Sequence, residues 1–266
     1  HRFMLLLPAL IVAYYMLYLL KSKRVGLRGG GALLASSIVC ACFAYTASAW
    51  AENHLLSLDE GGWVAQYGSG RWFYRTWELA PRLAFWISAS FPTLAIALAW
   101  QIHWGRRKYD EVAITTASRR LRALALDGLA ATAVSAIVWL AMLDSAARAP
   151  VISALGMPYL TLATISLIGQ GIAWWRVKTS AELSTPRLLL ISAFAVIEIL
   201  GTVVVREARR LGSIDIMALS ESHRQAAQVG GMGVFLLFFA INAAVIAVCI
   251  ILVARALAAR AKQLAG

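Results

Sequence analysis

The stretch AFAVIEILGTVVVREARR, residues 193–210, carries one carboxylate, Glu198, in the middle of an apolar run. A charged group at the centre of a membrane helix costs roughly 2.5 to 3.5 kcal/mol on insertion-based scales, so a cation, a proton pathway or a metal usually compensates it. The alternative is a protonated glutamate that is hydrogen-bonded to a neighbouring helix. Gln170 and Asn242 are the other strongly polar residues at comparable depth. Glu198 is therefore the first residue at which we expect chemistry inside the membrane.

Glu207 and Arg210 follow near the end of the same run, three residues apart. On a helix this spacing brings the two side chains to one face, where they can form an ion pair. A guanidinium at the mouth of a span can instead hold an anionic group of a cofactor, such as a haem propionate. Both interpretations stay open from the sequence.

The histidines are the other residues that could ligate a metal, and they are His1, His54, His103 and His223. Neutral imidazole is the commonest axial donor to haem. The orientation derived below places all of them except His103 on the outer side of the membrane, although a histidine in a surface loop is the ordinary alternative. No C-x-x-C-H, phosphate-loop or H-E-x-x-H motif occurs, which argues against c-type haem, nucleotide and zinc-peptidase chemistry.

The elements that must position these residues are membrane helices. Hydrophobic residues make up 61% of the chain, against roughly 45 to 50% in an ordinary soluble domain. Seven apolar runs are long enough to cross about 30 Å of hydrocarbon as helices, and they are residues 3–20, 31–50, 82–104, 123–143, 151–175, 188–205 and 231–254. The sequence therefore predicts an all-α polytopic membrane bundle of about seven transmembrane helices in one domain, residues 1–266.

Basic residues predict the orientation, because Lys and Arg are retained on the cytoplasmic side. Sixteen of the 25 lie in the connections 21–28, 106–122 and 176–187 and in the C-terminal segment 255–262. The other nine lie in the opposite set of connections, together with several acidic residues. We therefore expect the N-terminus outside and the C-terminus inside. The net charge of +12 is explained by this bias toward the anionic inner leaflet, so no nucleic-acid partner is expected.

The chain begins with His1 and not Met, so we expect a processed or partial gene product. The first apolar run is interpreted as a retained span and not a signal peptide, because the basic stretch KSKR follows it. Two external segments, residues 51–82 and 206–231, are longer than a turn requires. The first is rich in Trp, Tyr and Gly, which indicates either an interfacial aromatic belt or a docking surface or lid over a quinone or haem pocket.

Two consecutive segments, FAVIEILGTVVVREARRLGSIDIMALSES and GVFLLFFAINAAVIAVCIILVARAL, carry a resemblance to a known family. They resemble the C-terminal end of the large subunit of cytochrome bd-type quinol oxidases and their bd-like relatives. In that family a span glutamate is an axial ligand of a high-spin haem b, and Glu198 stands at the matching position. The family's outer E-x-G-R-Q-P-like turn is matched in part by Glu207, Arg209 and Arg210. Upstream, SAWAENHLLSLDEGGW and ELAPRLAFWISA are similar to the family's fourth and fifth helical regions.

The chain departs from the family at several positions. Phe85 stands where the family has a histidine ligand of its low-spin haem, and the long quinol-binding loop is reduced to DSAARAP, residues 144–150. The family's first two helices are absent, so the chain would correspond to the last seven of nine. Met157 stands where the family keeps its methionine ligand.

The resemblance implies a membrane subunit of a respiratory electron-transfer complex in the bacterial inner membrane, binding haem b, quinone or both. His54, His223, Glu207 and Arg210 are the further candidate cofactor contacts on the outer side. The expected partners are other membrane subunits and an external cytochrome, and any enzymatic role would be that of a quinol-linked oxidoreductase. The alternative is a cofactor-free membrane anchor or assembly subunit. A proton-coupled transporter that uses Glu198 is a third interpretation.

Overall fold

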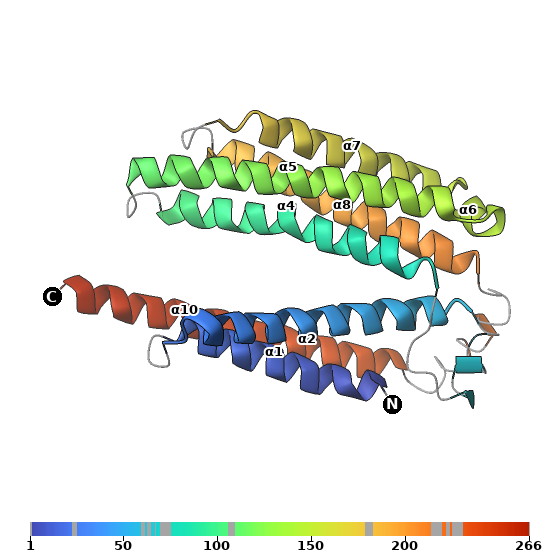
Figure 1. Ribbon diagram of the computed structural model, residues 1–266, viewed down its shortest axis with the longest axis horizontal. Coiled ribbons are helices and arrows are strands. Elements are labelled where there is room, and N and C mark those ends of the chain that lie inside the picture. Colours follow the sequence, from blue (N-terminus) through green and yellow to red (C-terminus); the bar gives the residue numbers. More distant parts are fainter. Residues whose placement is uncertain are drawn as a thin grey trace. The chain divides into compact units, whose positions relative to one another are not determined.

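The computed structural model describes residues 2–22, 26–59, 62, 65, 66, 68, 69, 76–105, 110–178, 183–213, 220, 221, 224 and 231–265. Every regular element among these residues is a helix (Figure 1), so the all-α prediction is confirmed for this part of the chain. The chain divides into two compact units, His1–Ser213 and Ile214–Gly266. The prediction of a single domain stays a prediction.

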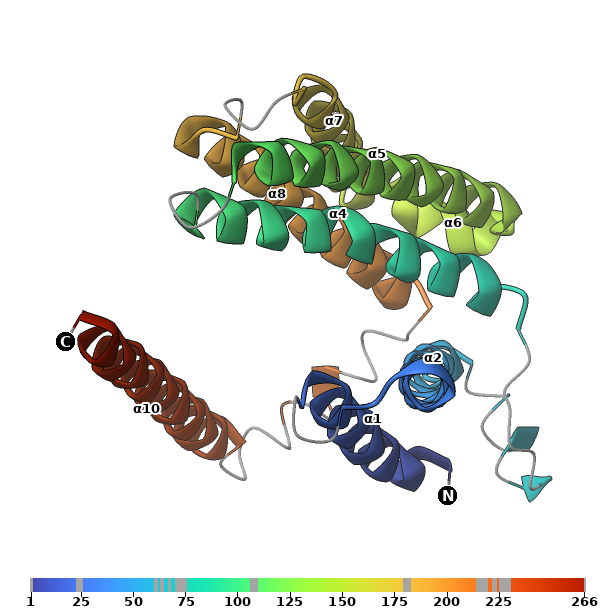
Figure 2. The same cartoon turned by 60° about the vertical axis from the view of Figure 1, so that its left-hand side comes forward.

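The first unit begins with an antiparallel pair of helices. A short 3-10 helix, η1 (Arg2–Leu5), leads into α1 (Leu6–Lys21), and α2 (Gly29–Leu56) returns beside it (Figure 2). Gly29 opens α2 at φ = 54°, in the left-handed region that glycine adopts without steric cost. The edge of Tyr14 contacts the ring of Phe43 at a centroid distance of 5.9 Å and joins the two helices.

Four longer helices and one short one complete the first unit. They are α4 (Leu79–Gly105), α5 (Glu111–Met142), α6 (Ser145–Val151), α7 (Gly156–Trp175) and α8 (Thr185–Leu211). In both views α4 lies along α5, and α7 lies along α8 (Figures 1 and 2). Asp110 and Asp144 accept backbone N–H groups at the starts of α5 and α6, which satisfies donors that a helix leaves free at its N-terminus.

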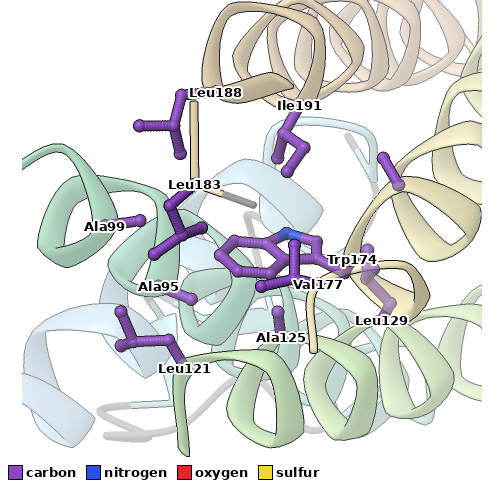
Figure 3. Close-up of a cluster of buried hydrophobic side chains, with 11 residues drawn as sticks. Ala95, Ala99, Leu121, Ala125, Leu129, Trp174, Val177, Leu183, Leu188 and Ile191 are labelled. Atoms are coloured by element: carbon purple, nitrogen blue, oxygen red, sulfur yellow. The ribbon is translucent and has the colours of Figure 1, made fainter. Parts of the chain in front are cut away.

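A buried indole holds these helices together near the end of α7 (Figure 3). Trp174 is fully buried, and small side chains on α4 and α5 leave room for its ring. The cluster comprises Ala95, Ala99, Leu121, Ala125, Leu129, Ala173, Trp174, Val177, Leu183, Leu188 and Ile191. Alanine at the facing positions allows close helix approach, which is the usual way in which membrane helices pack.

Five helices are long and apolar enough to cross a membrane, namely α2, α4, α5, α8 and residues 233–252 of α10 (Gly231–Ala265). A sixth span results if α6 and α7 count as one broken segment. At 16 residues, α1 is apolar but shorter than the others. The chain is therefore a multi-pass helical membrane protein by length and composition.

The predicted run 151–175 contains a bend close to its start. The chain bends by 75° between α6 and α7, and Ser153 turns it there. The Ser153 hydroxyl donates to the Pro150 carbonyl oxygen and accepts the backbone N–H of Gly156. A Cβ at Gly156 would lie 2.2 Å from the carbonyl oxygen of Val151, so the bend requires glycine at this position. Apolar composition predicts a span but does not reveal such a break.

The second unit contributes α10, the most apolar of the candidate spans. Its described side chains from residue 233 to 252 are all exposed. Asn242, the polar residue at its centre, donates to the Phe238 carbonyl oxygen of the same helix at 2.8 Å. That bond satisfies one amide donor within the helix itself. Such internal bonds are needed in a span because the bilayer core offers no water to polar groups.

Candidate functional site

A cavity of about 290 Å³ lies among the helices of the first unit. Its walls come from α4 (Pro81, Arg82, Phe85, Trp86), α5 (Ala136, Ile137, Trp139, Leu140), α7 (Leu160, Thr164) and α8 (Thr202, Val203, Val205, Arg206). On each helix the wall residues fall within one or two turns and include pairs three or four apart, so they share one face. Apolar walls with a few polar groups are typical of sites for small organic ligands, although this volume is at the lower end of their range.

Two arginines, Arg82 from α4 and Arg206 from α8, give the cavity its charge. The side chain of Arg82 is only 9% exposed, and its guanidinium carbon lies 5.7 Å from the centroid of the Trp139 ring. A guanidinium at this distance from an indole gains a cation–π interaction. The Nε of Arg82 is buried and has no hydrogen-bond partner among the described residues.

A buried carboxylate, Glu78, holds Arg82 in place. Glu78 accepts hydrogen bonds from Arg82 at 2.9 Å and from Arg209 at 3.1 Å, and the Trp139 indole N–H approaches it at 3.4 Å. These three donors come from α4, α8 and α5. We call this group the Glu78 cluster. The side chains of Glu78, Arg82 and Arg209 are about nine-tenths buried, so the ion pairs are little screened by solvent.

Glu198, the candidate intramembrane group, accepts a hydrogen bond from the Gln170 side-chain amide at 2.8 Å. Both residues are buried, and the bond joins α8 to α7. The remaining amide oxygen of Gln170 has no hydrogen-bond partner in the described part of the chain. The group that meets the carboxylate is thus an amide from the neighbouring helix, which corresponds to the hydrogen-bonded alternative stated for Glu198.

The two helices pack closely on either side of this bond. A Cβ at Gly169 would lie 2.7 Å from the Phe194 ring, and a Cβ at Gly201 would lie 2.9 Å from the Tyr159 carbonyl oxygen. A haem inserted between α7 and α8 would have to separate these contacts. The residues around Gln170 therefore do not fit a haem in this seam, and Glu198 does not line the cavity.

Replacing Gln170 by leucine removes the only donor that the structure describes for the Glu198 carboxyl group. A buried polar group that loses its hydrogen-bond partner lowers the free energy of unfolding by about 1–3 kcal/mol. We expect a loss of this size for Gln170→Leu, and reversible unfolding in detergent measures it. In the double variant with Glu198→Leu the loss should be smaller, because no orphaned carboxyl group remains. An equal or larger loss in the double variant would contradict this assignment.

None of the other predicted site residues that the structure describes lines the cavity. His54 is half-buried near the end of α2, and its Nε2 has no hydrogen-bond partner among the described residues. The Nε of Arg210 donates to both carboxylate oxygens of Glu207 at 2.8 and 2.9 Å, so the two residues form an ion pair. Met157 is exposed in the first turn of α7. His223 lies outside the described residues.

The structure thus brings His54 near Glu207 and Arg210, whose charges act on it, but it does not bring Met157 to them. No group of three or more His, Cys, Asp or Glu that could hold a metal occurs in the described ranges. Sequence reasoning missed Glu78, Arg82 and Trp139. A local signal was present, because Glu78 and Arg82 are four residues apart around Pro81, at the start of an apolar run. That spacing predicts an ion pair in the first turn of a helix.

The fold and this site define a class: a multi-pass helical membrane protein with an aromatic cavity and two arginines in its wall. No family model matches the chain, and neither curated proteins nor solved structures give a match.

Proposed function

We propose that the protein is a membrane subunit of a respiratory electron-transfer complex and that its cavity binds a quinone. The observation that supports this proposal is the composition of the cavity wall. Phe85, Trp86 and Trp139 offer flat apolar surfaces to a ring, and Arg82 and Arg206 offer N–H donors to a carbonyl oxygen. Quinones need this combination, because their ring is apolar and their two oxygens accept hydrogen bonds.

The hydroxyl groups in the wall suit the reduced form of the same ligand. Thr164 donates its proton to the Leu160 carbonyl oxygen at 2.8 Å, and Thr202 donates to that of Ile199 at 2.9 Å. Each hydroxyl oxygen then keeps lone pairs that can accept a hydrogen bond. A quinol O–H could donate to them, whereas the arginines can only donate. The site would therefore recognise the two redox forms through different groups.

The number of spans and the sides of the two termini are part of the proposal. Seven spans, with α1 and the broken α6–α7 segment included, would place the N-terminus outside and the C-terminus inside the bacterial inner membrane. Arg82 and Arg206 would then lie at the outer end of the bundle. An external cytochrome or another membrane subunit would exchange electrons with the ligand there. Haem b ligated by Glu198 is not part of the proposal, because the α7–α8 seam does not fit it.

A cofactor-free membrane anchor is the second candidate function. The specific observation in its favour is the Glu198–Gln170 bond, which compensates the intramembrane carboxyl group without any cofactor. An anchor would need no ligand in the cavity, so ligand binding separates the two candidates.

The test is a binding titration with the purified full chain in lipid nanodiscs. Menadione should quench the fluorescence of the tryptophans in the wall, Trp86 and Trp139. Ala136→Trp should lower the affinity by about tenfold or more, because a bulky ring then occupies the ligand's space. Ala130→Trp, an exposed position on the same helix, should leave the affinity unchanged. Absence of binding, or equal affinities in both variants, would favour the anchor.

A further inference from the structure

One end of the cavity carries more positive charge than the cavity's own contacts neutralise. Arg82 and Arg206 both line the cavity, and Arg209 lies beside Arg82 in the Glu78 cluster. The Glu78 carboxylate is shared between Arg82 and Arg209, so one negative charge faces two guanidinium groups. Arg206 is exposed and has no described hydrogen bond, although its charge acts on the nearby carboxylate of Glu207.

The guanidinium groups of the Glu78 cluster also have unused donors. The Nε atoms of Arg82 and Arg209 are buried without a hydrogen-bond partner in the described ranges, although their side chains are only 9% and 11% exposed. A buried donor without a partner is costly, and a charged donor more so. Arg82 lines the cavity and Arg209 does not, so an anionic oxygen in the cavity would offset that cost for Arg82 through a charge-assisted hydrogen bond.

Arg210 provides the contrast on the same helix. It lies one turn after Arg206, its Nε donates to both carboxylate oxygens of Glu207, and it does not line the cavity. Its guanidinium is therefore hydrogen-bonded to a carboxylate, whereas Arg206 in the cavity wall has only the longer-range attraction of the same Glu207.

We propose, building on the quinone site above, that the cavity selects an ionised ligand: a quinonoid ring whose deprotonated hydroxyl oxygen lies against Arg82 and Arg206. The three aromatic residues of the wall favour a flat ring over the flexible chain of an acidic lipid. Neutral quinones of the same size would bind more weakly, because they leave the excess positive charge unpaired.

The experiment compares two probes on the full chain in nanodiscs of zwitterionic lipid. Menadione is a neutral naphthoquinone, and lawsone is a hydroxynaphthoquinone that is ionised at neutral pH. We expect lawsone to bind about tenfold more tightly than menadione, the size of one charge-assisted hydrogen bond. Arg206→Gln should lower the affinity for lawsone by about tenfold and change the affinity for menadione by less than about twofold.

The double variant Glu207→Gln with Arg210→Gln is the matched control, since it removes an ion pair from the same helix without changing the net charge and without touching the cavity wall. Both affinities should stay within about twofold of the wild type. Arg82→Lys supplies a second variant in the wall, because it keeps the charge but loses the Nε donor and the fork geometry. Arg82→Lys should lower the affinity for lawsone more than the affinity for menadione. Unchanged affinities in both Arg206→Gln and Arg82→Lys would overturn the inference.

The outcomes separate the two proposals. Equal binding of both probes overturns the preference for an anion and leaves the quinone site standing. Failure of both probes overturns the quinone site and the inference together. Displacement of lawsone by phosphatidylglycerol in the nanodisc, with no displacement by menadione, would assign the arginines to a lipid headgroup and overturn the inference.

Discussion

Replacing Glu78 by alanine is expected to lower the free energy of unfolding by about 3–5 kcal/mol, the range measured when one partner of a buried ion pair is removed. The carboxylate accepts bonds from Arg82 on α4 and Arg209 on α8. Without it, two guanidinium groups stay nine-tenths buried and repel each other. The measurement is reversible unfolding of the purified protein in mixed micelles.

Glu207→Ala is the matched control for this prediction. Glu207 also pairs with an arginine, but both side chains of that pair are more than a third exposed. Exposed ion pairs contribute about 0–1 kcal/mol, so the control should change stability very little. A Glu78→Ala variant as stable as Glu207→Ala would show that the Glu78 cluster does not hold the helices together.

The Glu78 cluster and the cavity are linked, since Arg82 and Trp139 belong to both. Loss of Glu78 would release the guanidinium that we assign to ligand recognition. A stability measurement should therefore accompany every binding measurement on variants of this region.

Replacing Trp174 by alanine is the second change with a large expected effect, about 3–5 kcal/mol of the free energy of unfolding. Its indole is fully buried among side chains of α4, α5 and α8 (Figure 3). The alanines that surround it cannot expand into the space that it would leave. The expected readout is a lower unfolding midpoint in mixed micelles.

The neighbouring residue supplies the control. Trp175 is 64% exposed, and its ring stacks with the Arg122 guanidinium at 4.9 Å. Trp175→Ala should cost no more than about 1 kcal/mol, the size of an exposed cation–π contact. Similar losses in the two variants would contradict the position of the core at Trp174.

The apolar runs were predictable from the sequence, because a span depends mainly on the local density of apolar residues. Six of the seven runs lie in helix almost throughout their described residues, although α5 begins twelve residues before its predicted start, and the seventh, 151–175, contains the bend at 152–155. The bend between α6 and α7 was missed for a local reason. Ser153 and Gly156 redirect the backbone without lowering the average hydrophobicity of the segment.

The sequence by itself determined that Glu198 lies deep in an apolar helix and that Glu207 can pair with Arg210, because both facts depend on neighbours within about a turn. Only the tertiary structure decided what meets Glu198, since Gln170 lies 28 residues earlier on another helix. The same holds for Glu78 and Arg209, which are 131 residues apart, and for the cavity, whose wall comes from four helices. Helix packing brings such residues together, and the spacing of residues along the chain does not predict which helix faces pack against each other.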